Sequence, residues 1–163
     1  MNISRFGDKI IGVGGFINIS QNAKCVIFSG TLTAGGLDIG WEAGQTVIRE
    51  EGRHKKFVRK LEQVCYNATF AHERGQTALY VTERAVFRIG AQGLELIEVA
   101  PGVDLERDIF AQMEFRPQVS PDLKTMDARL FQPERLGIHD EVVARERRFR
   151  SARIAQWLAE KQQ

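Results

Sequence analysis

The chain of 163 residues lacks several patterns that would assign it to a particular class of protein. It has only two cysteines, Cys25 and Cys65, and Cys25 lies in a run predicted to be a buried strand, so neither a disulfide framework nor a metal site is expected. No apolar run approaches the roughly 20 residues that cross a membrane. The first nine residues show no basic region followed by an apolar stretch, so no secretory signal is visible and a cytoplasmic location is expected.

The sequence also lacks a strong excess of either charge. Its net charge is +2, and residues 141–163 alone carry six basic and three acidic groups. Because the positive excess belongs to one terminal segment, no broad basic surface for nucleic acid is expected. His54, His72 and His139 are far apart, and none has a partner at metal-ligand spacing, so no metal site and no Ser-His-Asp constellation is predicted.

Glycine, by contrast, is concentrated on either side of one short apolar run. The loop Gly12-Val13-Gly14-Gly15 precedes the run Cys25–Phe28, and Thr33-Ala34-Gly35-Gly36 follows it. The run has the length and the β-branched, aromatic content of a buried strand, so we expect both loops at its two ends. Glycines let backbone N–H groups approach an anion or an oxyanion closely. The alternative is that these glycines only form tight turns.

The composition, with 43% hydrophobic and 27% charged residues, is typical of one globular domain. In the first two thirds of the chain, short strands are predicted at residues 24–28, 45–49, 78–82, 85–89 and 94–99. The last two of these strands are expected to form a hairpin. The period then changes toward 3.6, and Asp104 is expected to cap a helix from Leu105 to about Met113.

Proline and helix-forming residues organise the rest of the chain. Pro117, Pro121 and Pro133 predict an extended segment that wraps over the body of the domain. From Asp140 onward Ala, Glu, Arg, Gln and Leu dominate, so we expect a terminal helix with a short apolar patch formed by Ile154, Trp157 and Leu158.

Four blocks in this order resemble one known family: Gly12 to Asn18, Thr82 to Phe87, Leu94 to Leu105, and Ser120 to Leu123. They resemble the C-terminal part of the β half of acyl-CoA:carboxylate CoA-transferases, of the acetate, propionate or short-chain acyl type and, more weakly, of the 3-oxoacid type. The resemblance covers roughly residues 2–137. It implies an α/β fold of the CoA-transferase β-domain type over residues 1–137, with a central sheet, flanking helices and the extended wrap. Residues 138–163 are expected to form a basic helical tail and show no family match.

In this family a glutamate carboxylate attacks the acyl-CoA, and the resulting glutamyl-CoA thioester passes CoA to a second carboxylic acid. The resemblance implies that the backbone N–H groups of Gly14 and Gly15 stabilise the oxyanion that develops in each step. It implies an acyl-CoA thioester and a short-chain carboxylate such as acetate as substrates, with no permanently bound cofactor. The residues expected to line the substrate and CoA loops are Gly12, Phe16, Asn18, Thr33, Gly35 and Gly36, although a tight turn explains Gly35 and Gly36 equally well.

The sequence departs from the family at the nucleophile. In the family the glutamate lies in an E-x-G segment upstream of the glycine loop, whereas the eleven residues before Gly12 contain no glutamate. Glu42-Ala43-Gly44 fits E-x-G but follows the loop, so we interpret it as a chance match. The α half is also absent from the printed sequence.

Two hypotheses follow from this departure. The first is that the chain is a truncated or separately encoded β segment, inactive until an α/β partner chain supplies the glutamate, and prone to self-association. The second is a non-catalytic protein-interaction module derived from the same fold.

Overall fold

The structure, a computed structural model, describes residues 4–6, 9–11 and 13–145. The chain divides into two compact units, Met1–Pro133 and Glu134–Gln163. In the described part of the second unit there is one helix, α3 (His139–Ala144), at the start of the expected terminal helix. The expected apolar patch of Ile154, Trp157 and Leu158 lies outside the described residues.

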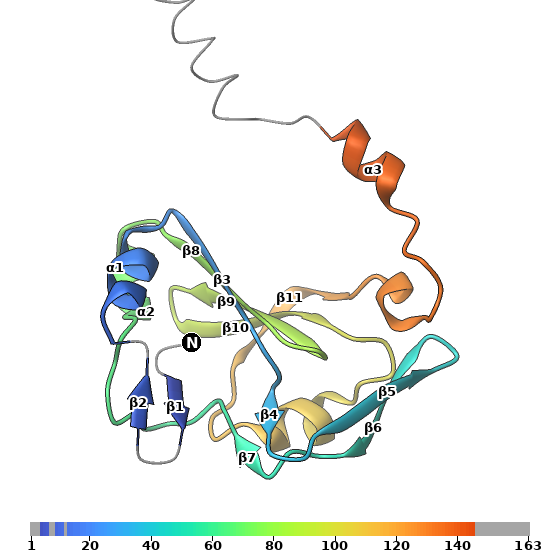
Figure 1. Cartoon of the computed structure of the whole chain (residues 1–163), viewed down its shortest axis with the longest axis horizontal. Helices are drawn as coiled ribbons and strands as arrows, with labels where there is room; N and C mark the ends of the chain where they lie inside the picture. The colour runs from blue at the N-terminus through green and yellow to red at the C-terminus, as the bar shows by residue number, and fades with distance from the viewer. Residues whose placement is uncertain (1–3, 7–8, 12, 146–163) are drawn as a thin grey trace, which may run out of the picture. The chain divides into compact units, whose positions relative to one another are not determined.

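A five-stranded sheet in the order β11-β10-β9-β8-β3 forms the centre of the first unit (Figure 1). Its middle is an antiparallel meander of β8 (Thr77–Val81), β9 (Ala85–Gly90) and β10 (Gly93–Val99). At one edge β3 (Cys25–Ser29) runs parallel to β8, and at the other β11 (Gln118–Thr125) runs parallel to β10. The α/β fold with a central sheet and the positions of its four predicted strands are confirmed. The prediction that the first of them is buried is wrong, because β3 is an edge strand on which Cys25 and Ile27 are exposed.

The strand β11 corrects the prediction of an extended wrap after residue 117. This segment is extended, but it pairs with β10 instead of lying over the body of the domain. The pairing shifts register between Leu96 and Glu98, whose partners are Val119 and Lys124, so the residues around Pro121 loop out of the ladder. Proline has no N–H to donate and is tolerated at such an irregular edge, which is why it did not exclude a strand.

One face of the sheet is covered by the segment that follows Asp104. The predicted cap is confirmed, because the Asp104 carboxylate accepts a hydrogen bond from the Arg107 N–H. The expected regular helix is instead a π-helical turn, η1 (Leu105–Ile109), followed by a 3-10 turn, η2 (Phe110–Gln112). The irregular path still brings its apolar residues into the core, which comprises Leu32, Ala85, Phe87, Leu96, Ile109 and Met113.

A helix that the sequence did not predict, α1 (Gly15–Asn22), separates the first glycine loop from β3. The prediction that this loop directly precedes the strand is therefore wrong. Near the start of the helix, the side chain of Phe16 packs in an aromatic cluster with Phe28 and Tyr66, beside α2 (Ala68–Glu73). With only eight residues, α1 is too short to show a clear helical period in the sequence and depends on this packing.

The described residues of the first unit also form three small two-stranded sheets. They are β1 (Ser4–Phe6) with β2 (Lys9–Ile11), β4 (Thr33–Ala34) with β7 (His54–Lys55), and β5 (Asp38–Glu42) with β6 (Gln45–Glu50). The predicted strand 45–49 is thus confirmed as part of a separate hairpin. A 3-10 turn, η3 (Ala128–Phe131), packs Phe131 with Val86, Ala100 and Met126. None of the helices in the described ranges is long and apolar enough to cross a membrane.

Candidate functional site

The first glycine loop ends at Gly14, the residue that precedes α1. Gly14 has φ 137° and ψ −119°, a conformation that side-chain-bearing residues rarely adopt. Its carbonyl accepts hydrogen bonds from the N–H groups of Ile17 and Asn18, at 3.0 and 3.4 Å. The N–H groups of Gly15 and Phe16 belong to the first turn, where an α-helix offers no intrahelical acceptor and carries its partial positive charge. The loop therefore presents backbone donors at a helix N-terminus.

Gly14 and Gly15 are both exposed, and a Cβ added to either would meet none of the described atoms within 4 Å. The backbone conformation explains why Gly14 is glycine. Nothing comparable constrains Gly15, which has an ordinary helical conformation and open space around it. A glycine that neither the backbone nor packing requires is consistent with the close approach of another molecule. Gly12 lies outside the described residues.

The two other residues expected in this loop have different environments. The ring of Phe16 packs against that of Phe28, with the centroids 6.2 Å apart, so its side chain anchors the loop to the core. Asn18 is exposed, and its carbonyl accepts a hydrogen bond from Asn22 Nδ2 at 2.7 Å. Of the two, Asn18 is the one open to solvent.

The second group of expected site residues forms a separate cluster. Thr33 is fully buried, and its hydroxyl donates to the Glu51 carboxylate and accepts from the Gly52 N–H at 3.2 Å. Gly35 and Gly36 have φ of 84° and 99°, and a Cβ on Gly35 would lie 2.7 Å from the His54 ring. These contacts give the turn interpretation a structural basis. In Figure 1, α1 lies beside the start of β3, whereas β4 and this turn follow the end of β3, so the structure does not bring the two glycine loops together.

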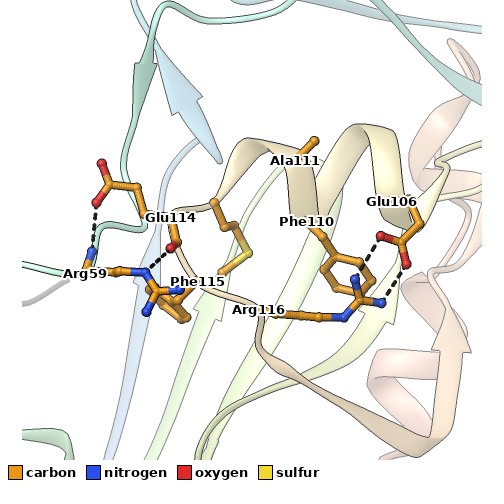
Figure 2. A pocket seen from close by; sticks show the side chains of 8 residues that line it. Arg59, Glu106, Phe110, Ala111, Glu114, Phe115 and Arg116 are labelled. Atoms are coloured by element: carbon orange, nitrogen blue, oxygen red, sulfur yellow. Dashed lines mark hydrogen bonds and ion pairs between the residues drawn. The ribbon is translucent and has the colours of Figure 1, made fainter.

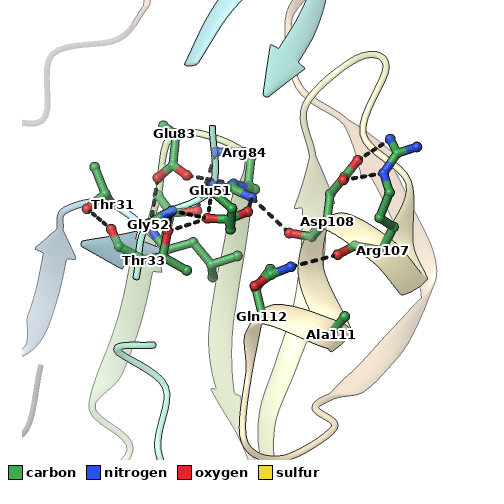
Figure 3. A network of polar contacts seen from close by, with 12 residues as sticks. Thr31, Thr33, Glu51, Gly52, Glu83, Arg84, Arg107, Asp108, Ala111 and Gln112 are labelled. Atoms are coloured by element: carbon green, nitrogen blue, oxygen red, sulfur yellow. Dashed lines mark hydrogen bonds and ion pairs between the residues drawn. The ribbon is translucent and has the colours of Figure 1, made fainter. Parts of the chain in front are cut away.

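A buried polar cluster that no local sequence pattern indicates is centred on Arg84, in the turn between β8 and β9 (Figure 3). Arg84 is fully buried and holds Glu51 with two hydrogen bonds, Nη1 to Oε2 at 2.7 Å and Nη2 to Oε1 at 3.1 Å. Its Nε donates to Glu83 Oε1 at 2.6 Å, and Nη1 also donates to the Asp108 carbonyl at 3.0 Å. Glu83 in turn accepts from the Leu32 N–H at 2.8 Å. One cation thus connects four segments of the chain.

The charges in this cluster stabilise one another. Burial raises the pKa of Glu51, but hydrogen bonds from Arg84, Thr33 and the Gly52 N–H, together with the charge of Arg84, outweigh it and hold that pKa below its usual value. Burial alone would lower the pKa of Arg84, yet its two glutamate partners raise it. Glu51 is therefore an ionised carboxylate whose two oxygens are already occupied, which does not suit a nucleophile.

The E-x-G match at Glu42-Ala43-Gly44 is the turn of the β5–β6 hairpin. Ala43 and Gly44 have φ of 51° and 75°, which together fit a two-residue turn of type I′. Glu42 is exposed and lies 3.8 Å from Arg49 across the hairpin. The sequence contains two further E-x-G matches, Glu50-Glu51-Gly52 and Glu73-Arg74-Gly75. The second lies at the C-terminal end of α2, where Gly75 has φ 69°. Turn formation accounts for the glycine in two of these three matches.

An open hollow of about 370 Å³ lies beside η1 and η2 (Figure 2), and its lining residues include neither Gly14 nor Gly15. Arg116 lies over the Phe110 ring at 4.0 Å and pairs with both carboxylate oxygens of Glu106, at 2.6 and 2.8 Å. Arg59 Nε donates to the Glu114 carbonyl at 2.6 Å. Both arginines are thus engaged within the hollow. Among the described residues no group of three or more His, Cys, Asp or Glu could hold a metal ion.

Comparison with known proteins relates this arrangement to one class of enzyme. No protein-family model matches the chain. It is 50% identical over 131 residues to acetate CoA-transferase YdiF of Escherichia coli and 44% identical over 136 residues to caffeate CoA-transferase of Acetobacterium woodii. The chain is homologous to part of a CoA-transferase. These matches cover 80% of the chain but only 25% and 26% of the two relatives, so the chain spans about a quarter of the length of the curated relatives it matches.

Solved CoA-transferase structures confirm the fold. The chain matches the acyl-CoA transferase YdiF from E. coli O157:H7 in its thioester complex with CoA, with a TM-score of 0.78 and 49% identity over 83% of this chain and 27% of that one. The YdiF apoenzyme gives a TM-score of 0.77 and 50% identity over 82% of this chain. The central sheet and its loops therefore have the CoA-transferase fold.

Proposed function

We propose that the unit described here contributes the glycine loop of a CoA-transferase that moves CoA between a short-chain acyl-CoA and a carboxylate such as acetate. The observation that carries this proposal is the homology to CoA-transferases at about half identity over four fifths of the chain. The backbone N–H groups of the exposed residues Gly14 and Gly15, at the start of α1, supply a chemical feature that the reaction needs. CoA is a substrate in this proposal, and no cofactor is permanently bound.

In the proposed reaction a glutamate carboxylate attacks the thioester carbonyl, and negative charge develops on the carbonyl oxygen. Fixed N–H donors stabilise that charge without reorganising during the reaction. The donors in this chain are the backbone N–H groups of Gly14 and Gly15, the positions that the resemblance indicates. The positive end of α1 adds to the stabilisation.

The nucleophilic glutamate is proposed to lie outside these 163 residues. Within the described chain Glu51 is held by Arg84, and Glu42 flanks an exposed hairpin turn far along the chain from the glycine loop. The chain alone should then bind or orient an acyl-CoA at most, without forming a thioester. The remaining part of the CoA-transferase, on the same or another polypeptide, is the proposed partner.

A chimera tests this proposal directly. Residues 2–137 replace the homologous quarter of E. coli YdiF, and CoA exchange is measured from acetyl-CoA to a second short-chain carboxylate. We expect exchange by the chimera and none by the isolated chain. A folded chimera that catalyses no exchange would contradict the proposal and favour a non-catalytic interaction module, and exchange by the isolated chain would show that the nucleophile lies within it.

A further inference from the structure

The C-terminal end of α1 is held by a side chain from a distant part of the sequence. The last carbonyl groups of a helix have no intrahelical partner and need another donor. Two carbonyls at the end of α1, those of Ser20 and Ala23, accept hydrogen bonds from Nε2 of Gln76. The Ser20 contact is 2.6 Å long and joins residues 56 positions apart. Gln76 therefore closes the end of the helix that begins at the glycine loop.

The orientation of the Gln76 amide is fixed by Tyr66. A backbone carbonyl only accepts hydrogen bonds, so the amide nitrogen must face the two carbonyls and the amide oxygen must face away from them. There Oε1 of Gln76 accepts from the Tyr66 hydroxyl at 2.6 Å. Burial raises the pKa of Tyr66, so the hydroxyl keeps its proton and remains a donor. Tyr66 thus holds the amide in the orientation that binds α1.

Both members of the Tyr66–Gln76 pair are attached to rigid parts of the fold. The Gln76 N–H donates to the Ala71 carbonyl in α2 at 2.9 Å. The next residue, Thr77, begins β8, and its N–H donates to the Lys24 carbonyl at 3.1 Å. Tyr66 is fully buried in the aromatic cluster. The pair is therefore a fixed support against which α1 is held.

We infer that Gln76, oriented by Tyr66, is a positioning residue for the backbone donors of the glycine loop. This inference rests on the proposed function. The eight residues of α1 span about 12 Å, and so short a helix has little stability of its own. The Phe16 ring anchors its first turn, and Gln76 anchors its last. Without Gln76 the helix can pivot about Phe16, which changes the direction of the Gly14 and Gly15 N–H groups.

A change of direction should affect catalysis more than substrate binding. One further contact, from the Asn67 N–H to Gln21 Oε1 at 2.8 Å, keeps α1 attached when Gln76 no longer binds it. The oxyanion exists only in the transition state, so misaligned donors should lower kcat and leave KM for the acyl-CoA nearly unchanged. Misplacement of a group by about 1 Å can cost about 100-fold in rate.

Steady-state kinetics of the YdiF chimera test the inference. Gln76→Glu keeps the size of the side chain, but the carboxylate cannot donate to the helix carbonyls. We expect kcat per folded enzyme to fall at least about tenfold, with KM for acetyl-CoA changed by less than about twofold. Tyr66→Phe keeps the ring and removes the hydroxyl, so it should lower kcat in the same way but less. If Gln76→Glu does not fold, Tyr66→Phe provides the test.

Gln112→Glu is the matched control for these variants. Nε2 of Gln112 also donates to a backbone carbonyl, that of Arg107 at 3.2 Å, but this contact joins η2 to η1 instead of holding α1. The same substitution there should leave kcat unchanged. An unchanged kcat in both Gln76→Glu and Tyr66→Phe, or an equal loss in Gln112→Glu, would overturn the inference.

Amide NMR signals of the isolated chain provide a readout that does not depend on activity. The signals of Gly14 and Gly15 should shift in Gln76→Glu and stay in place in Gln112→Glu, and unshifted signals in Gln76→Glu would overturn the inference. An inactive wild-type chimera together with shifted glycine signals would refute the proposed function alone. An active chimera whose kcat is unaffected by Gln76→Glu would refute the positioning role alone.

Discussion

Gly14 and Gly15 are adjacent, but glycine is needed at the two positions for different reasons. Substitutions at the two positions should therefore affect stability and activity differently. Gly14 has φ 137°, so Gly14→Ala should destabilise the loop. Gly15 is helical with open space around it, so Gly15→Ala should preserve or slightly raise stability. If substrate approaches the Gly15 N–H, the new Cβ should lower the exchange rate of the chimera by about 100-fold, the typical cost of losing one oxyanion donor. Thermal melts and steady-state rates of both variants measure the two effects, and an unchanged rate in Gly15→Ala would remove Gly15 from the mechanism.

Arg84 is the residue on which the fold depends most. Arg84→Met should lower the free energy of unfolding by about 3 kcal/mol or more, because it leaves the largely buried Glu51 and Glu83 without their cation. Arg88→Met is the matched control on the strand β9 that follows Arg84, since Arg88 is 49% exposed and its surface pairing with Glu95 should contribute far less to stability. Urea unfolding of the two variants gives the comparison. Similar losses in both would show that the Arg84 cluster is not a special source of stability.

The Arg84 cluster is an example of a feature that could not be predicted from the sequence. Strands such as 85–89 and 94–99 were predicted because alternation and glycine turns are local signals. The partner of Arg84 is Glu51, 33 positions earlier, and no local pattern connects two charged residues at that distance. The glycine loop was identified as a candidate site from its residues alone. The N-terminus of α1, which orients the backbone N–H donors of the loop, depends on the packing of Phe16 against Phe28.

Among the elements, the errors have a common cause. The strand β11 was not predicted, because Pro121, Asp122 and Lys124 are unfavourable in a strand that pairs on both sides. The same residues protect an edge strand from pairing with another chain. The segment after Asp104 was expected to be an α-helix because its cap and apolar spacing are local, whereas its π and 3-10 geometry follows from fitting against the sheet. The type of secondary structure was therefore predictable where the signal was local. The prediction was wrong where tertiary contacts determined the type.

The β5–β6 hairpin offers a stabilising substitution. Ala43 adopts φ 51° in its turn, a left-handed conformation that costs an alanine roughly 1 kcal/mol. Asparagine followed by glycine is the favoured pair for such a turn, so Ala43→Asn should raise the free energy of unfolding by up to about 1 kcal/mol. Calorimetry of the isolated chain measures the change. A lower melting temperature would show that this turn differs from the type assigned to it.

The molecule as a whole should be labile to acid. The pKa of Asp108 is lowered chiefly by hydrogen bonds from Arg107, and the pKa of Glu51 is held below its usual value of 4.5 by Arg84 despite burial. A carboxyl whose pKa is lower in the folded state contributes stability above its unfolded pKa and loses it as the pH falls through the folded value. Stability should therefore decrease as the pH falls below about 4.5, the unfolded value for Glu51, and less steeply in Arg84→Met. Urea midpoints that stay constant over this range would contradict the assignment.

The location of the enzyme thioester tests the central claim most directly. The YdiF chimera is incubated with acetyl-CoA, treated with borohydride or hydroxylamine to trap a glutamyl thioester, and digested for mass spectrometry. We predict one modified glutamate in the part contributed by YdiF and none in the isolated chain treated in the same way. A trapped adduct on Glu42, or on any other glutamate of these 163 residues, would contradict it.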